Sequence, residues 1–262
     1  MTGTVISPSR RRLLQAGSAL ALFQGSGLLG CDAQNNSPFR IVDKFPHDPR
    51  AFTQGLLYHQ SRFYESTGLR GRSSLREVDP ETGEVLRIHR LADRFFAEGL
   101  ALVGEELIQL TWQAGVAFRY RLADFRPLGE FRYYTEGWGL TFDGERLIMS
   151  DGSDRLVFRD PASFRQLGTV AVRDQGHPVA RLNELEYIDG EVWANVWQTD
   201  DIVRIDPASG EVKRRLKLTG LLAPEDRTGH EDVLNGIAFD ITAGRLFVTG
   251  KLYPFVYELQ VN

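Results

Sequence analysis

Two glutamates, several carboxamides, one lysine and a group of aromatic residues occupy matching places along this sequence, within or beside short apolar segments. They are Glu98 and Glu184; Gln54, Asn183, Asn195 and Asn235; Lys251; and Phe52, Trp112, Trp138, Trp193 and Trp197. A carboxylate can carry protons, a cation or an amide can stabilise developing negative charge, and indole rings can enclose an apolar stem. Together they predict a site for a ligand with a polar head on an apolar stem.

Each of these residues also has a structural interpretation. Trp193, Asn195 and Trp197 would share one face of a strand, where tryptophan most often packs between neighbouring elements. A glutamate at a strand start is often a solvated rim residue, and asparagine before a strand is often a turn residue. The pattern alone therefore does not identify a reaction.

The motifs of several other chemistries are missing from the sequence. The histidines are scattered without the spacing of zinc ligands. The sequence contains no Gly-x-Ser-x-Gly elbow, phosphate-binding loop or dinucleotide fingerprint. Cys31, the one cysteine, falls in the N-terminal segment and is unavailable as a nucleophile. These absences argue against metal hydrolysis, covalent catalysis and nucleotide use, and we expect no metal site and no cofactor.

The elements that would position the candidate residues repeat along the chain. Five related segments open with an apolar strand around Gly-Leu or a close variant, at residues 54–58, 98–102, 138–142, 183–187 and 235–239. They lie roughly 40–50 residues apart, which is the range of β-propeller blades. The first strand of each blade lines the central channel, so residues at these openings would converge on one face.

Within a unit the order of strands and turns also repeats. The second strands alternate in polarity, as at residues 146–149 and 191–197, and the third strands end at Asp-Pro turns at 79–83, 160–164 and 206–210. A fourth, more polar strand follows, for example at 84–88. Four strands per unit predict a propeller blade.

The two ends of this region complement each other. The fifth unit supplies three strands and stops near residues 256–259, while residues 39–43 form a strand that precedes the first unit. We therefore predict an all-β, five-bladed β-propeller over residues 39–262, closed by its N-terminal strand. A two-sheet sandwich is the alternative, but it would not predict five similar openings.

The composition limits the partners. The formal net charge is −4, and the first thirty residues contain Arg10, Arg11 and Arg12 but no acidic residue, so the remainder is more acidic still. An acidic protein repels phosphate backbones, and we expect no nucleic-acid partner. A single cysteine cannot form an intramolecular disulfide, so the core and the ring closure must stabilise the fold.

The first thirty residues resemble an export signal. Ser9-Arg10-Arg11-Arg12-Leu13-Leu14 matches a twin-arginine motif, and the apolar segment that follows is too interrupted by glycine and polar residues for a transmembrane helix. A general secretory signal with three arginines is the alternative. We predict a signal peptide at residues 1–30 and export to the periplasm or cell envelope.

A lipobox-like sequence, Leu28-Leu29-Gly30-Cys31, ends this segment. It predicts cleavage before Cys31 and lipidation of the Cys31 thiol, whereas the alternative is a free cysteine in a discarded signal. Residues 31–38 would be a lipidated polar tether that anchors the domain to a membrane.

From residue 39 to 262 the chain resembles the plant- and bacterial-type glutaminyl-peptide cyclotransferases, also called glutamine cyclotransferases. The longest matching segments are Arg-Leu-Asn-Glu-Leu-Glu-Tyr at 181–187, Gly-Glu-Val-Trp-Ala-Asn at 190–195 and Trp-Gln-Thr-Asp at 197–200. Further matches lie at 47–49, 52–56, 64–69, 71–74, 98–100, 137–140, 150–152, 232–238 and 248–252. So many motifs in one order make the resemblance specific.

The resemblance implies a five-bladed propeller that closes the N-terminal glutamine of a peptide into pyroglutamate and releases ammonia without a metal ion. It implies Glu98 as the general acid and base, and Gln54, Asn183 and Lys251 as groups that bind or polarise the substrate. Phe52, Trp112, Trp138 and Trp197 would line the pocket. We expect peptides or proteins with N-terminal glutamine as partners, and a monomer.

Two other classes of function fit the pattern less well. A propeller that only binds peptides or scaffolds envelope proteins would have no need of a carboxylate in an indole-lined channel. A calcium-dependent hydrolase or lactonase would need several channel-facing carboxylates, for which Asp151, Glu184 and Glu186 are the candidates.

Overall fold

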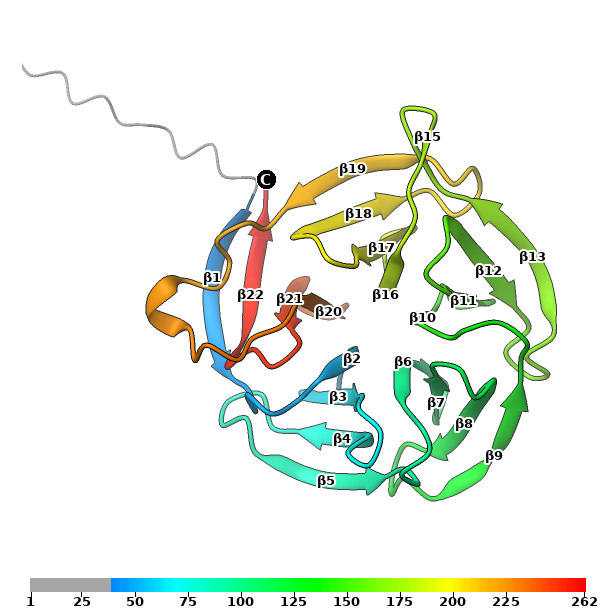
Figure 1. Cartoon of the computed structure of the whole chain (residues 1–262), viewed down its shortest axis with the longest axis horizontal. Coiled ribbons are helices and arrows are strands. Elements are labelled where there is room, and N and C mark those ends of the chain that lie inside the picture. Colours follow the sequence, from blue (N-terminus) through cyan, green and yellow to red (C-terminus); the bar gives the residue numbers. More distant parts are fainter. Residues whose placement is uncertain (1–38) are drawn as a thin grey trace, which may run out of the picture. The chain divides into compact units, whose positions relative to one another are not determined.

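The computed structural model of the chain describes residues 39–262, which form five four-stranded antiparallel sheets around a central axis (Figure 1). The predicted all-β, five-bladed propeller is confirmed. The predicted signal peptide, the lipobox at Cys31 and the tether lie outside the described residues.

The first four blades each use four consecutive strands, ordered from the axis outward. Blade 1 contains β2 (Thr53–His59), β3 (Arg62–Thr67), β4 (Ser74–Val78) and β5 (Val85–Arg90). Blade 2 contains β6 (Ala97–Val103), β7 (Glu106–Thr111), β8 (Val116–Arg121) and β9 (Pro127–Arg132). Blade 3 contains β10 (Leu140–Phe142), β11 (Leu147–Met149), β12 (Arg155–Arg159) and β13 (Gln166–Ala171). Blade 4 contains β16 (Leu182–Ile188), β17 (Glu191–Val196), β18 (Asp201–Ile205) and β19 (Val212–Lys217).

The fifth blade joins the two ends of the described chain. Its strands run from the axis outward as β20 (Leu234–Asp240), β21 (Arg245–Gly250), β22 (Phe255–Val261) and β1 (Phe39–Pro46). β1 pairs antiparallel with β22 along its whole length, from Phe39 opposite Val261 to Pro46 opposite Phe255. Each inner strand contacts the next one around the axis, β2 with β6, β6 with β10, β10 with β16, β16 with β20 and β20 with β2, so the ring of inner strands is continuous.

Burial follows the position of a strand in its blade. The inner strands β2, β6, β16 and β20 are buried along most of their length, because blades flank them on both sides. Outer strands such as β5 alternate between half-buried and exposed side chains, since one face meets solvent. The apolar clusters lie between adjacent blades; one, for example, joins Trp193 and Ile202 of blade 4 to Ile237 and Val248 of blade 5.

Two small elements interrupt the propeller pattern. A two-stranded hairpin, β14 (Arg173–Asp174) with β15 (His177–Pro178), connects blades 3 and 4, and a 3-10 turn, η1 (Pro224–Asp226), lies between β19 and β20. Over residues 39–262, no helix has the length and apolar character needed to cross a lipid bilayer.

Blade 3 departs from the expected boundaries. Its inner strand begins at Leu140 rather than at Trp138. Trp138 and Gly139 both bond to Ser150: the Trp138 N–H donates to the Ser150 carbonyl (3.0 Å), the Ser150 N–H to the Gly139 carbonyl (3.0 Å) and the Gly139 N–H to the Ser150 hydroxyl (2.7 Å). Two residues thus face one, and the regular ladder begins only at Leu140.

Candidate active site

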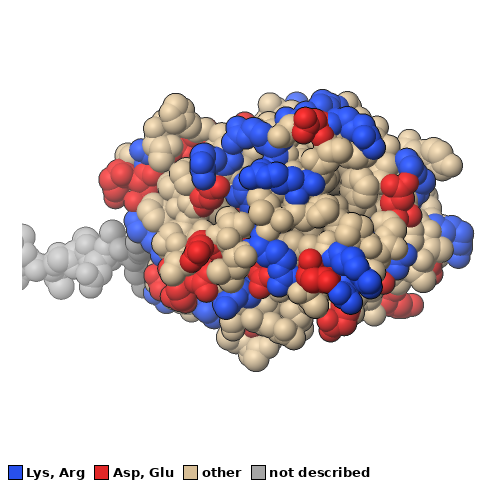
Figure 2. Space-filling view, turned by 90° about the horizontal axis from the view of Figure 1, so that it is seen from below, with Lys and Arg blue, Asp and Glu red and all other residues tan. Residues whose placement is uncertain are grey.

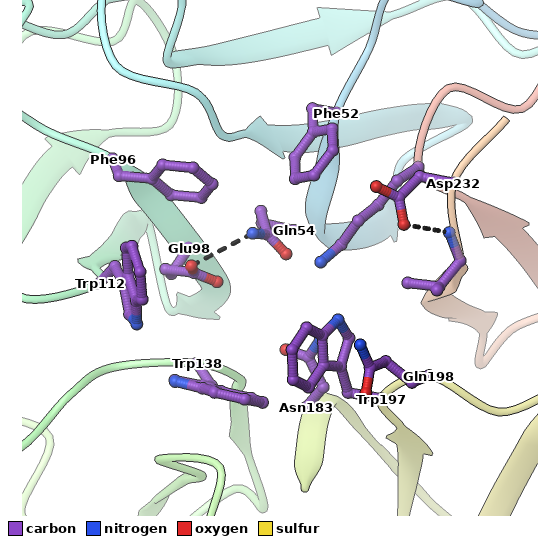
Figure 3. Close-up of a pocket in the computed structure, with 12 residues that line it drawn as sticks. Phe52, Gln54, Phe96, Glu98, Trp112, Trp138, Asn183, Trp197, Gln198 and Asp232 are labelled. Atoms are coloured by element: carbon purple, nitrogen blue, oxygen red, sulfur yellow. Dashed lines mark hydrogen bonds between the residues drawn. The ribbon is translucent and has the colours of Figure 1, made fainter. Parts of the chain in front are cut away.

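A pocket of ≈ 370 Å³ opens at the end of the propeller where the inner strands begin (Figure 3). Its size suits a small ligand group or the end of a peptide. The lining residues come from all blades and from the loops between them: Phe52, Gln54, Phe96, Glu98, Trp112, Trp138, Asn183, Trp197, Gln198, Asp232, Val233 and Lys251. The eight site residues that the resemblance implies are therefore brought together.

β-Bulges place the polar side chains of the inner strands. The pairing register shifts between Thr53 and Gly55 in β2, and between Ala97 and Leu100 in β6. Equivalent shifts occur at the starts of β16 and β20. Gln54, Glu98 and Asn183 lie at these irregular positions. A bulge re-aims a side chain out of the alternating pattern, and here it turns polar groups into the pocket.

A second set of pocket residues directly follows the second strand of a blade. Trp112 follows β7, Trp197 follows β17 and Lys251 follows β21. The backbone N–H of Trp112 donates to the Phe96 carbonyl and that of Lys251 to the Val233 carbonyl. This repeated turn fixes one inward-pointing side chain in each of blades 2, 4 and 5.

Glu98 is the buried carboxylate of the pocket, with only 5% of its surface exposed. Its Oε1 accepts a hydrogen bond from Nε2 of Gln54 at 3.1 Å, and Oε1 of Gln54 in turn accepts from Nδ2 of Asn235 at 3.3 Å. Burial raises the pKa of Glu98 well above its usual range; the positive charge of Lys251 opposes this shift and the negative charge of Glu136 adds to it. A carboxyl with a raised pKa holds a proton more readily than an exposed one, which suits a group that must both accept and return a proton.

Lys251 supplies the cation of the pocket and is 4% exposed. Its Nζ lies 5.0 Å from the centroid of the Phe52 ring. Burial lowers the pKa of this ammonium group, while the negative charges of Glu98 and Asp232 act in the opposite direction. The lysine forms no ion pair within the described part of the chain, so its charge is available to a ligand.

One carboxylate orients two of the indole walls. Oε2 of Glu136 accepts hydrogen bonds from Nε1 of Trp112 at 2.7 Å and from Nε1 of Trp138 at 2.9 Å. The other oxygen of Glu136 accepts from the side-chain amide of Gln113. Trp138 also meets Trp197 edge to face, with ring centroids 5.5 Å apart. The rings therefore have fixed orientations before any ligand enters.

Asn183 carries a polar atom without a partner. Its Oδ1 is buried and accepts no hydrogen bond within the structure, although Asn183 lines the pocket. A buried acceptor without a partner is costly, but this oxygen is shielded from the pocket, so the amide of Asn183 would have to turn for a ligand N–H to reach it.

Four candidates from the sequence lie outside the pocket lining. Trp193 packs between blades 4 and 5 under the Arg204 guanidinium, which is the structural interpretation of that residue. Asn195 accepts a hydrogen bond from the Gly236 N–H. Asn235 lies behind Gln54, as described above. The expectation that Trp193, Asn195 and Trp197 share one strand face is wrong for Trp197, because β17 ends at Val196.

Glu184 is the fourth of these residues and lies near the propeller axis. It takes the place that Gly55 and Gly99 occupy in blades 1 and 2. Its two carboxylate oxygens accept backbone N–H groups of Leu56 (3.3 Å) and Ile237 (2.8 Å). Glu186, on the same strand, accepts from the Phe239 N–H at 3.2 Å. Both glutamates thus connect blade 4 to blade 5, and Glu184 also connects it across the axis to blade 1. Within residues 39–262 no group of three or more His, Cys, Asp or Glu side chains is arranged to hold a metal ion.

The sequence reasoning missed several pocket residues: Phe96, Gln198, Asp232, Val233 and the indole-orienting Glu136. The repeat contained the signal for some of them. Phe96 precedes Glu98 by two positions, just as Phe52 precedes Gln54, so aligning the blade openings would have found it. Glu136 carried no such signal, because it lies in the irregular entry to blade 3.

The chain is similar to proteins of one family. The family model described as glutamine cyclotransferase matches residues 16–261. A glutaminyl-peptide cyclotransferase of Arabidopsis thaliana is 45% identical over 226 residues, covering 85% of this chain and 71% of the plant protein. The crystal structure of the glutaminyl cyclase of Myxococcus xanthus superimposes with a TM-score of 0.80 at 40% identity, covering 86% of this chain and 96% of that one.

Proposed function

Because the chain belongs to the glutamine cyclotransferase family, we propose that its pocket converts the N-terminal glutamine of a peptide into pyroglutamate, with Glu98 as the proton carrier and without a metal ion. The single observation that carries the proposal is the buried carboxylate of Glu98, held by Gln54 in a pocket lined by three tryptophans and one unpaired lysine.

The substrate would enter with its glutamine side chain between the aromatic walls. The apolar stem of glutamine fits against Trp112, Trp138 and Trp197, while the γ-carboxamide reaches the polar floor. After a turn of its amide, Oδ1 of Asn183 would accept an N–H of the substrate and would no longer be an acceptor without a partner within the described residues. Holding nucleophile and electrophile of one residue in the reactive conformer supplies much of the rate enhancement.

The reaction is an intramolecular transfer. The lone pair of the α-amine attacks the γ-carboxamide carbon and forms the ring C–N bond. The ionised Glu98 takes a proton from the attacking nitrogen, and then returns it to the γ-nitrogen as the original C–N bond breaks, so ammonia leaves and Glu98 is ionised again. The oxyanion formed between the two steps lies near a positive charge, for which the Lys251 ammonium is placed.

The proposed independence from metal ions rests on that charge. In many hydrolases a metal ion polarises the carbonyl oxygen. In this pocket the buried ammonium of Lys251 can do so without coordination, and Gln54 and Asn183 supply further dipoles.

Ammonia release from a short peptide that begins with glutamine tests the proposal, using residues 32–262 with a chelator present. We expect turnover in the chelator, and a loss of roughly 100- to 10,000-fold in kcat for Glu98→Gln, which keeps the hydrogen-bonding shape but cannot shuttle protons. The variant should still bind the peptide and unfold like the wild type. Near wild-type turnover in Glu98→Gln would contradict the role of Glu98. Peptide binding by the wild type without any ammonia release would indicate a binding module instead.

The placement of the protein in the cell is part of the same proposal. The twin-arginine-like motif and the lipobox support export of the chain and attachment to a membrane through a lipid on Cys31. The propeller would then act as a monomer in the periplasm or cell envelope, on exported peptides and proteins with N-terminal glutamine.

A further inference from the structure

A second cavity, of ≈ 190 Å³, lies on blade 1 and is lined mainly by arginines. We call it the arginine cavity; its lining consists of Arg50, Arg72, Arg76, Arg90, Asp48, Thr67 and Gly68. Four guanidinium groups thus face a single carboxylate. No step of the proposed reaction uses these side chains.

Two of the arginines form ion pairs. Arg76 is buried, donates a hydrogen bond from Nε to the Ser74 hydroxyl at 3.0 Å and pairs with Asp48 at 3.1 Å. Glu65 lies 3.7 Å from the same guanidinium. Arg50 also pairs with Asp48, at 3.1 Å, but its side chain is 81% exposed. Arg76, Asp48 and Glu65 therefore form the buried, charge-compensated floor of the cavity, and Arg50 lies at its rim.

The other two arginines carry the surplus charge. Arg72 donates a hydrogen bond to the Arg50 carbonyl, and Arg90 lies at the end of β5. Neither forms an ion pair within residues 39–262, and both are exposed. A guanidinium presents a planar fork of donors that matches a carboxylate. Arg72 and Arg90 thus leave the cavity ready to accept one anionic group.

The arginine cavity and the catalytic pocket share a wall that is one residue thick. Gly68 lines the arginine cavity and donates its backbone N–H to the Phe52 carbonyl of the catalytic pocket at 2.8 Å. A Cβ atom on Gly68 would collide with the Phe96 ring and lie 3.1 Å from Cγ of Gln54. A peptide that leaves the catalytic pocket over this wall arrives directly at the arginines.

The charge of the surrounding surface also favours an anionic peptide on the path from the catalytic pocket to the arginine cavity. Figure 2 looks onto the side of the propeller that carries β5 and β9, and Lys and Arg side chains gather in the upper half of this view. The Arg70 guanidinium, in the loop between β3 and β4, lies 5.7 Å from the centroid of the Trp112 ring at the edge of the catalytic pocket. The chain as a whole is acidic, so this basic side is a local feature.

We propose that the arginine cavity is a second substrate subsite, which binds a carboxylate in the residues that follow the N-terminal glutamine. The inference rests on the proposed cyclase function and adds a preference for acidic peptides. Each extended residue advances a peptide by about 3.3–3.6 Å, so the side chains of the next few residues span the wall formed by Gly68. The carboxylate can come from an aspartate or glutamate side chain or from the C-terminus of a short peptide.

The test compares kcat/KM for matched peptides that begin with glutamine. One set is amidated at the C-terminus and carries either glutamate or glutamine at the second, third or fourth position; another is neutral in its side chains with a free C-terminus. The proteins are the wild type, the variant Arg72→Ala with Arg90→Ala, and a control, Arg155→Ala with Arg165→Ala. The control removes the same charge from two exposed sites on blade 3.

We expect the wild type to favour at least one acidic peptide roughly three- to tenfold, the gain expected for one partly exposed, charge-assisted contact. The preference should appear in KM, weaken in high salt, disappear in the Arg72/Arg90 variant and persist in the control. The position of the best glutamate, or a preference only for the free C-terminus, identifies the source of the carboxylate.

A wild type that turns over acidic and neutral peptides equally would overturn the subsite, as would a preference that survives in the Arg72/Arg90 variant. Turnover of the neutral, amidated peptide serves as the separate check on the cyclase function. If that peptide reacts and no preference exists, only the subsite fails; if no peptide reacts, the proposed function fails first.

Discussion

At the scale of single residues, the chemistry depends on a carboxyl and an ammonium group that share one buried space. Glu98 must be ionised to accept the proton of the attacking amine, while Lys251 must be charged to stabilise the oxyanion. Burial raises the pKa of Glu98 and lowers that of Lys251, so burial opposes both charges. The attraction between the two groups partly restores the charges, and each therefore depends on the other.

This coupling predicts opposite pH shifts for two variants. Lys251→Met removes a positive charge that lowers the pKa of Glu98, so the acid limb of the kcat–pH profile should move to higher pH. Glu136→Gln removes a negative charge that raises the pKa of Glu98, so the limb should move to lower pH. All profiles are measured with the same peptide, so that the titration of its α-amine contributes equally to each of them. Shifts of both variants in the same direction would contradict the assignment of the limb to Glu98.

The site residues could be named from the sequence to different degrees. Gln54, Glu98 and Asn183 were found because they share one position in a repeat, and a bulge at that position turns them inward. Phe96 had the same kind of signal. Glu136 could not be predicted, because its role depends on the indole N–H groups of Trp112 and Trp138, which lie 24 and 2 residues away in the chain.

At the scale of elements, the inner strands are held together by buried carboxylates as well as by apolar packing. Burying an ionised carboxylate costs free energy, and Glu186 of β16 shows this, because burial raises its pKa to about 8. A carboxyl whose folded-state pKa lies above its unfolded value contributes stability at low pH, and that contribution is lost as pH rises through the folded-state pKa.

Glu186→Gln should remove this pH dependence. Between pH 5 and pH 9 the wild type should lose free energy of unfolding relative to the variant, on the order of a few kcal/mol. Urea unfolding at both pH values measures the difference. Glu211→Gln, on an exposed residue of the same blade, is the control and should follow the wild type. If the difference in free energy of unfolding between the wild type and Glu186→Gln stays constant across this range, the pKa of Glu186 is not raised in the folded state.

The element boundaries were predictable where the repeat was regular. The openings at 54–58, 98–102, 183–187 and 235–239 all lie within inner strands. Blade 3 was different, because Trp138 and Gly139 both bond to Ser150 and the regular ladder begins only at Leu140. An irregularity of this kind leaves no trace in hydrophobic periodicity.

At the scale of the whole molecule, the ring is closed by one strand. Phe45 of β1 is buried between blades 5 and 1, where its ring lies 6.0 Å from that of Phe247. Phe45→Ala should lower the free energy of unfolding by about 3–5 kcal/mol, since it leaves a cavity at the closure. Val42→Ala, on the exposed side of the same strand, should change it by less than about 0.5 kcal/mol. Equal effects in urea unfolding would mean that β1 contributes little to the closure.

The proposed anchor makes a prediction at the same scale. Fractionation of cells that produce the full chain should find the protein with the membranes, and Cys31→Ala should move it to the soluble fraction while purified protein keeps its activity. A wild type that is already soluble would contradict lipidation of Cys31.

The pairing of β1 with β22 also determines when the ring can close during synthesis. During synthesis β1 emerges first, yet its partner emerges more than 200 residues later, as the bond between Arg40 and Gln260 illustrates. The five blades must therefore remain an open arc until translation has passed residue 261, and closing so long a loop carries an entropic cost that slows folding. The strand that completes the ring follows the proposed export segment, so each new chain passes through an interval in which the proposed signal is present and the propeller is not yet closed.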